Sequence, residues 1–293
     1  MKKNKLLILL ISMLTLLPGC SLTKDSMEDI TIYTTIYPVK YLIDSLYGEY
    51  STIYSIYPSG IDPSEYEISE KKIKEYANTD LFVFNSLDRD RDFAVDMINK
   101  NKDLKIIDVS LGMTYDNDIA ELWLNPYNYL MMAQNTKNGL LEYVENPYLI
   151  SNNDKTGIED KYEELQYNLS RLDADMKEDI SLAEYKTIVV DNDLFKFLEK
   201  YDLKVISLEE NDNLNDNTIN EVKKLINDKE IKYIFSADKE TNSTCKSLIK
   251  NYNLNLVTLN TMTSIDGGIT NSNENYLTVM NNNIDLLNKE LYK

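Results

Sequence analysis

The sequence predicts an α/β protein of two lobes, each built on a parallel sheet, with one long rigid helix connecting them. Short β-rich segments alternate with helical patterns in two successive groups, which indicates repeated strand–helix units. Most of the β-rich segments are continuous apolar runs, as expected for strands that a parallel sheet buries on both faces. Between the two groups, an apolar stripe at helical spacing crosses residues 158–185 without Gly or Pro.

The first lobe is expected over residues 30–150. Pro38 favours a helix start because its fixed φ angle is close to the helical value. Ser69 is a candidate N-cap because its hydroxyl can accept a hydrogen bond from a free backbone N–H of the first turn. The expected strands are 30–36, 52–57, 80–85 and 105–109, and the expected helices are 39–47, 70–77 and 92–100.

The second lobe is expected over residues 186–293. Thr218 and Glu221 have the spacing of a capping box, which predicts a helix start at this point. The expected strands are 187–191, 203–208, 232–236 and 255–260, and the expected helices are 194–200, 219–227 and 243–251.

The connecting helix is expected over residues 157–184. Its apolar residues follow one another in steps of three or four, which places them on one helix face. At about 1.5 Å per residue, a helix of this length could run along both lobes. A surface helix of one lobe and a short coiled coil are the alternatives. The stripe consists of Ile158, Tyr162, Leu165, Leu169, Leu172, Met176 and Ile180.

The N-terminus has the pattern of an export signal. Three lysines precede an apolar stretch over residues 6–17, which is short for a membrane span of about 20 residues. Leu17-Pro18-Gly19-Cys20 resembles the bacterial lipobox, which implies removal of residues 1–19 and lipid modification of Cys20. Residues 20–29 would then be a lipid-anchored tether at the outer face of the cytoplasmic membrane. The alternative is an ordinary signal peptide or anchor with an incidental cysteine.

The composition excludes several classes of function. Lysine and arginine total 31 against 49 acids, which gives a net charge of −18 and disfavours nucleic acid as a partner. The chain contains no histidine, so histidine-dependent catalytic triads and histidine-ligated zinc are excluded. Besides Cys20 there is one cysteine, Cys245, which is expected to be a small core residue.

Several segments resemble one known family. Residues 60–67, Gly-Ile-Asp-Pro-Ser-Glu-Tyr-Glu, match the pattern G-x-D-P-H-x-Y-E at seven of eight positions. Residues 34–38, 74–85, 121–126 and 191–201 also resemble segments of the metal-binding solute receptors of ABC importers, the zinc and manganese class. The resemblance implies a periplasmic-binding-protein-like fold and a monomer that is not an enzyme. It would deliver a divalent cation to an ABC permease and its ATPase.

In this family four side chains from both lobes converge on one cation, and three are often histidine. Position by position, the resemblance places Ser64, Glu121 and Asp191 in the first three ligand slots. The fourth slot falls near Asp266, with Ser264 and Asn260 as alternatives. Trp123, inside the second ligand motif, is expected to be a packing anchor beneath the site.

Two interpretations of these substitutions remain. In the first, Ser64, Glu121, Asp191 and Asp266 form an all-oxygen site that takes Mn²⁺ or Ca²⁺ more readily than Zn²⁺. In the second, the metal site has been lost and the chain is a metal-independent, adhesin-like or accessory surface lipoprotein. Structural roles are then expected: Ser64 in a turn, Glu121 as a solvated loop acid, and Asp191 at the end of a strand.

Overall fold

The computed structural model describes residues 27–144, 157–263 and 274–293. The predicted export signal, the lipidation site Cys20 and the predicted ligand Asp266 lie outside these residues. In the described part of the chain, no helix is both long enough and apolar enough to cross a membrane.

The first lobe is built on a parallel sheet with the strand order β2-β1-β3-β4. Its strands are β1 (Ile30–Thr34), β2 (Ser51–Ser55), β3 (Leu81–Phe84) and β4 (Lys105–Asp108). Its helices are α2 (Tyr37–Tyr47), the 3₁₀ turn η1 (Gly48–Tyr50), α3 (Glu70–Tyr76), α4 (Asp90–Lys100), α5 (Glu121–Leu124) and α6 (Pro126–Tyr143). Ser69 caps α3 as predicted, because its side chain accepts from the backbone N–H of Lys72 at 3.4 Å.

Helices α5 and α6 were not expected from the sequence. The buried face of α6 contains Thr136 as well as apolar residues, whereas Tyr127 and Met131 on its other side are exposed. This mixture weakens the contrast between an apolar and a polar face, which is the sequence signal for a helix. The helix begins at Pro126, after the N-cap residue Asn125, whose side chain accepts from the N–H of Tyr127.

The second lobe repeats the same sheet order, β6-β5-β7-β8, again with all strands parallel. Its strands are β5 (Thr187–Val190), β6 (Lys204–Ser207), β7 (Tyr233–Ser236) and β8 (Asn255–Thr258), and its helices are the 3₁₀ helix η2 (Asp193–Tyr201), α8 (Asp216–Asn227) and α9 (Ser243–Tyr252). The capping box predicted at Thr218 is wrong. Asn215 caps α8 instead and accepts from the N–H groups of Asn217 and Thr218.

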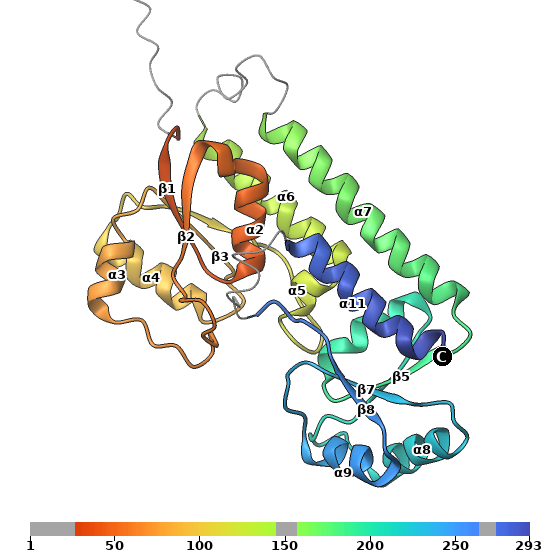
Figure 1. Ribbon diagram of the computed structural model, residues 1–293. Coiled ribbons are helices and arrows are strands. Elements are labelled where there is room, and N and C mark those ends of the chain that lie inside the picture. Colours follow the sequence, from red (N-terminus) through yellow and green to blue (C-terminus); the bar gives the residue numbers. More distant parts are fainter. Residues whose placement is uncertain (1–26, 145–156, 264–273) are drawn as a thin grey trace, which may run out of the picture.

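One unbroken helix, α7 (Ile158–Leu182), connects the two lobes. Figure 1 shows it extending from the first lobe to the second, and it contacts α2 and α6 of the first lobe and η2 of the second. All seven residues of the predicted stripe are buried. The predicted fold class, two parallel α/β lobes joined by a long helix, is confirmed.

The C-terminal helix α11 (Tyr276–Leu291) lies beside α7 and reaches the first lobe. The ring of Tyr276 stacks on Tyr129 of α6 with a centroid distance of 4.1 Å. One apolar core therefore continues from the first lobe through α7 and α11 into the second, while a smaller core lies under α8 and α9. Because the lobes share this core, moving one against the other would disrupt buried contacts.

Candidate solute cleft

A cavity of about 510 Å³ lies between the two lobes. The residues that line it follow the carboxyl ends of strands from both sheets, which is where open parallel sheets bind ligands. The first lobe contributes Ile36, Gly60, Asp62, Pro63, Ser64, Asp88, Asp118, Ile119, Ala120 and Trp123, and the second contributes Asn192, Leu194, Ala237, Asp238, Thr261 and Thr263.

The cavity is acidic. Asp62, Asp88 and Asp118 line it from the first lobe and Asp238 from the second, and none of the described lining residues is a lysine or an arginine. The negative charges of these aspartates attract cations to the cavity and repel anions from it. Arg89, which does not line the cavity, fixes the 60–64 loop. Its Nη1 donates to the carbonyl oxygens of Pro63 at 3.3 Å and Ser64 at 2.7 Å.

Of the predicted ligands that the structure describes, Ser64 lines the cavity. Its backbone N–H and its hydroxyl both donate to Oδ1 of Asp62, at 2.8 and 2.7 Å. The hydroxyl oxygen keeps its lone pairs, so it can still accept a hydrogen bond or contact a cation. Ser64 therefore forms a turn with Asp62 and faces the solute space at the same time.

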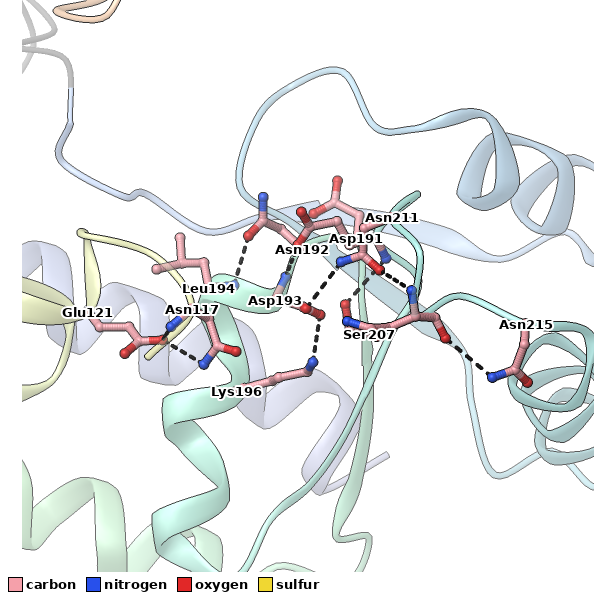
Figure 2. Close-up of polar contacts among 12 residues, drawn as sticks. Asn117, Glu121, Asp191, Asn192, Asp193, Leu194, Lys196, Ser207, Asn211 and Asn215 are labelled. Carbon is pink, nitrogen blue, oxygen red and sulfur yellow. Dashed lines mark hydrogen bonds and ion pairs between the residues drawn. The ribbon is translucent and has the colours of Figure 1, made fainter. Parts of the chain in front are cut away.

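Glu121 is buried, with 4% of its surface exposed, so the alternative of a solvated loop acid is wrong. Its Oε2 accepts from the N–H of Asp116 at 3.1 Å, and its Oε1 accepts from the N–H and the Nδ2 of Asn117 at 3.1 and 2.8 Å. Figure 2 shows its carboxylate directed at Asn117. Both oxygens of the Glu121 carboxylate are thus engaged by its own loop.

Asp191 follows strand β5 and is half-buried. Its Oδ1 accepts from the N–H of Ala237 at 3.2 Å and its Oδ2 from the hydroxyl of Thr241 at 2.6 Å. Burial raises the pKa of this carboxyl group above its usual value. Asp191 does not line the cavity, whereas the next residue, Asn192, does.

The fourth ligand position stays a prediction because Asp266 and Ser264 lie outside the described residues. The alternative Asn260 uses its backbone N–H and carbonyl to bond the side chain of Asn283, and its side chain accepts from the N–H of Met262. Within residues 27–144, 157–263 and 274–293, no three Asp, Glu, Cys or His side chains are grouped so that they could hold a metal ion.

Sequence reasoning missed the four aspartates that line the cavity. Asp62 lies in the segment 60–67 that resembles the family, and Asp88 follows the segment 74–85. Asp118 and Asp238 lie in loops that contact the predicted ligands Glu121 and Asp191. The available signal was their position, since each follows a strand at its carboxyl end. Trp123 is 2% exposed, which confirms its prediction as a packing anchor.

Comparisons with known proteins agree with this architecture. The zinc-binding lipoprotein AdcA of Streptococcus pneumoniae serotype 4 is 24% identical over 313 residues, covering 98% of this chain but 60% of AdcA. The metal ABC transporter substrate-binding lipoprotein ScbA of Streptococcus cristatus is 27% identical over 222 residues, covering 68% of this chain and 69% of ScbA. The chain therefore spans less than two thirds of AdcA's length.

Solved structures show the same fold. The metal-dependent lipoprotein YcdH of Bacillus subtilis superposes with a TM-score of 0.71 at 18% identity, covering 90% of this chain and 100% of YcdH. A mutant of the laminin-binding adhesin Lmb of Streptococcus agalactiae superposes with a TM-score of 0.69 at 18% identity, covering 89% and 99% of the two chains. The profile of the family described as zinc-uptake complex component A, periplasmic (ZnuA) matches residues 32–290, so the chain belongs to this family.

Proposed function

We propose that this chain is the solute-binding component of a metal-type ABC importer, which captures a divalent cation in the cleft and delivers it to a permease and its ATPase. One observation carries the proposal: aspartates from both lobes line the cavity at the strand ends, and none of the described lining residues is a lysine or an arginine. The names of AdcA and ScbA supply the class of solute. The proposed activity is binding and release without a chemical step.

The chemistry of the donor atoms favours a hard cation. The chain has no histidine, and its free cysteine Cys245 is buried, so the cleft offers carboxylate, hydroxyl, amide and carbonyl oxygens. Such ligands suit Mn²⁺ or Ca²⁺ better than Zn²⁺. A cavity of about 510 Å³ is also larger than a bare ion, so the bound cation would keep some of its water. The family positions Ser64, Glu121, Asp191 and Asp266 mark where it would bind.

The proposal includes the attachment of the protein to the cell. A lipid on Cys20 and the tether 20–29 would hold a monomer at the outer face of the cytoplasmic membrane, with the lobes 30–150 and 186–293 presenting the cleft to the permease. The acidic composition gives no support for binding nucleic acid.

A metal-independent surface lipoprotein is the second candidate. It is favoured by the absence, among the described residues, of a preformed group of metal-binding side chains, and by the engaged oxygens of Glu121 and Asp191. One similar structure is named a laminin-binding adhesin.

The two candidates are separated by measuring the melting temperature of the mature protein with Mn²⁺, Ca²⁺, Zn²⁺ and Mg²⁺. A cation at 100 times its Kd stabilises the folded state by about 2.7 kcal/mol, which a thermal shift detects easily. We expect the largest shift with Mn²⁺ or Ca²⁺. If none of the four cations raises the melting temperature, the importer proposal is wrong and the second candidate replaces it.

A further inference from the structure

Glu121 and Asp191 have the same relationship to the cleft. Neither lines the cavity, and each binds the backbone of a loop whose own aspartate does line it: Asp118 for Glu121, and Asp238 for Asp191. The two loops belong to different lobes, so the arrangement occurs once on each side of the solute space.

In the first lobe, Glu121 closes the 116–118 loop. Its carboxylate accepts from the backbone N–H groups of Asp116 and Asn117, and its own N–H donates to the carbonyl oxygen of Asp118 at 3.0 Å. The Oδ1 of Asp118 accepts from the N–H of Ala120 at 2.8 Å, while none of the described residues donates to its Oδ2. Asp118 is therefore fixed in orientation and retains a free oxygen at the cavity.

In the second lobe, Asp191 holds the loop after strand β7 at two points, Ala237 and Thr241. Asp238 lies between these points, and its carbonyl oxygen accepts from the hydroxyls of Ser236 at 2.7 Å and Thr258 at 3.3 Å. Its backbone is thereby fixed, whereas its carboxylate is exposed and bonded to none of the described residues.

The energetics favour the outer aspartates as the groups that meet a cation. Glu121 would have to release three hydrogen bonds and Asp191 two before they could turn into the cleft. Thr241 is buried, and leaving a buried donor unpaired costs about 1–3 kcal/mol, so this exchange is unfavourable for Asp191. The donors of Glu121 belong to exposed residues, so its exchange costs the net value of the lost hydrogen bonds, about 0.5–1.5 kcal/mol each. Asp118 and Asp238 offer free oxygens without any such loss.

We propose that Glu121 and Asp191 are positioning residues, and that Asp118 and Asp238 contact the cation in their place. The inference rests on the proposed function for the identity of the solute. It assigns the choice of cation to the two loops that carry Asp118 and Asp238. Glu121 and Asp191, at the family's second and third ligand positions, would then orient these loops without contacting the cation.

Asparagine variants in the second lobe test the assignment. Asn at position 191 keeps an acceptor for the N–H of Ala237 and can donate to the Thr241 oxygen, so Asp191→Asn removes the charge but preserves the loop. We expect Asp191→Asn to bind Mn²⁺ within about threefold of the original chain, and Asp191→Ala and Asp238→Asn to bind at least about 10-fold more weakly in titration calorimetry. Asp228→Asn is the charge-matched control, because Asp228 is exposed at the end of α8 and does not line the cavity.

A second measurement does not depend on a bound cation. Hydrogen exchange of the segment 236–242 should be faster in Asp191→Ala, and unchanged in Asp191→Asn and Asp238→Asn. Asp118→Asn and Glu121→Ala give the same comparison for residues 116–120, with exchange faster only in Glu121→Ala.

The outcomes separate this inference from the proposed function. If Asp191→Asn binds Mn²⁺ as weakly as Asp191→Ala while Asp238→Asn binds normally, Asp191 is a direct ligand and the inference is overturned. If no cation binds to the original chain, the proposed function fails. In that case the hydrogen-exchange data still test the positioning role. Unchanged exchange in both Asp191→Ala and Glu121→Ala would refute it.

Discussion

Trp123 donates its indole N–H to the carbonyl oxygen of Thr261 at 2.7 Å, and this bond joins the two lobes at the wall of the cleft. The carbonyl oxygen of Trp123 accepts from the hydroxyl of Tyr276 at 2.6 Å. The one tryptophan of the sequence thus contacts residues on both sides of the segment 264–273. It is a structural link between the lobes as well as part of the cavity lining.

Trp123→Phe should lower the free energy of unfolding by about 1–3 kcal/mol, because the hydrogen bond to the Thr261 carbonyl is lost and the smaller ring leaves space in a buried site. Urea denaturation followed by circular dichroism measures this difference. Tyr127→Phe is the control, since Tyr127 is 62% exposed and its change should be within about 0.5 kcal/mol. Equal unfolding midpoints for the two variants would show that the interlobe bond does not contribute.

Asp90 gives the protein a specific pH dependence. It is 2% exposed, accepts from the hydroxyl of Tyr57 at 2.5 Å, and burial raises its pKa to about 6. Because this value lies above that of the unfolded chain, the folded state takes up the proton first on acidification. The stabilising contribution is complete below about pH 4 and is lost as the pH rises through about 6.

Asp90→Asn should therefore be more stable than the original chain at pH 7, by an amount that disappears toward pH 4. The rise in the pKa of Asp90 from 3.8 to about 6 corresponds to about 3 kcal/mol, because one pKa unit is worth about 1.4 kcal/mol. Urea midpoints of both proteins between pH 4 and pH 8 provide the measurement. A stability difference that is constant over this range would contradict the role of Asp90.

Cys245 should be unreactive in the folded protein. It is fully buried in the smaller core of the second lobe, and burial raises the pKa of its thiol to about 12. Since the thiolate is the reactive form, iodoacetamide at pH 8 should label the protein only after denaturation. Mass spectrometry of the labelled peptide checks this, and rapid labelling of the native protein would mean that the core around α9 opens readily.

Cys20→Ala should accumulate as unprocessed precursor and incorporate no radioactive lipid when expressed in a bacterium with lipoprotein processing enzymes. The reason is that a thiol at this position would be the acceptor of the lipid. Cys245→Ala is the matched control and should be labelled normally. Equal lipid incorporation into both variants would show that Cys20 is not the modified residue.

The sequence predicted the elements whose signal is local. Continuous apolar runs such as 81–84 and 187–190 are strands of the two parallel sheets, and the spacing from Ile158 to Ile180 is that of the connecting helix. The start of α8 was misplaced because Asn215, a strong cap, lies just before the candidate Thr218. Helix α6 was missed because its two faces differ little in polarity.

The sequence by itself thus determined the fold class, and its resemblance to the family marked Ser64, Glu121 and Asp191, which lie in or beside the cleft. Only the tertiary structure decided which way their side chains point. The partners of Asp191, Ala237 and Thr241, are 46 and 50 residues away, and they meet it because β5 and β7 are neighbours in one sheet. A buried carboxylate accepts hydrogen bonds from the donors that the fold places beside it. The local sequence does not show which donors a neighbouring strand will supply.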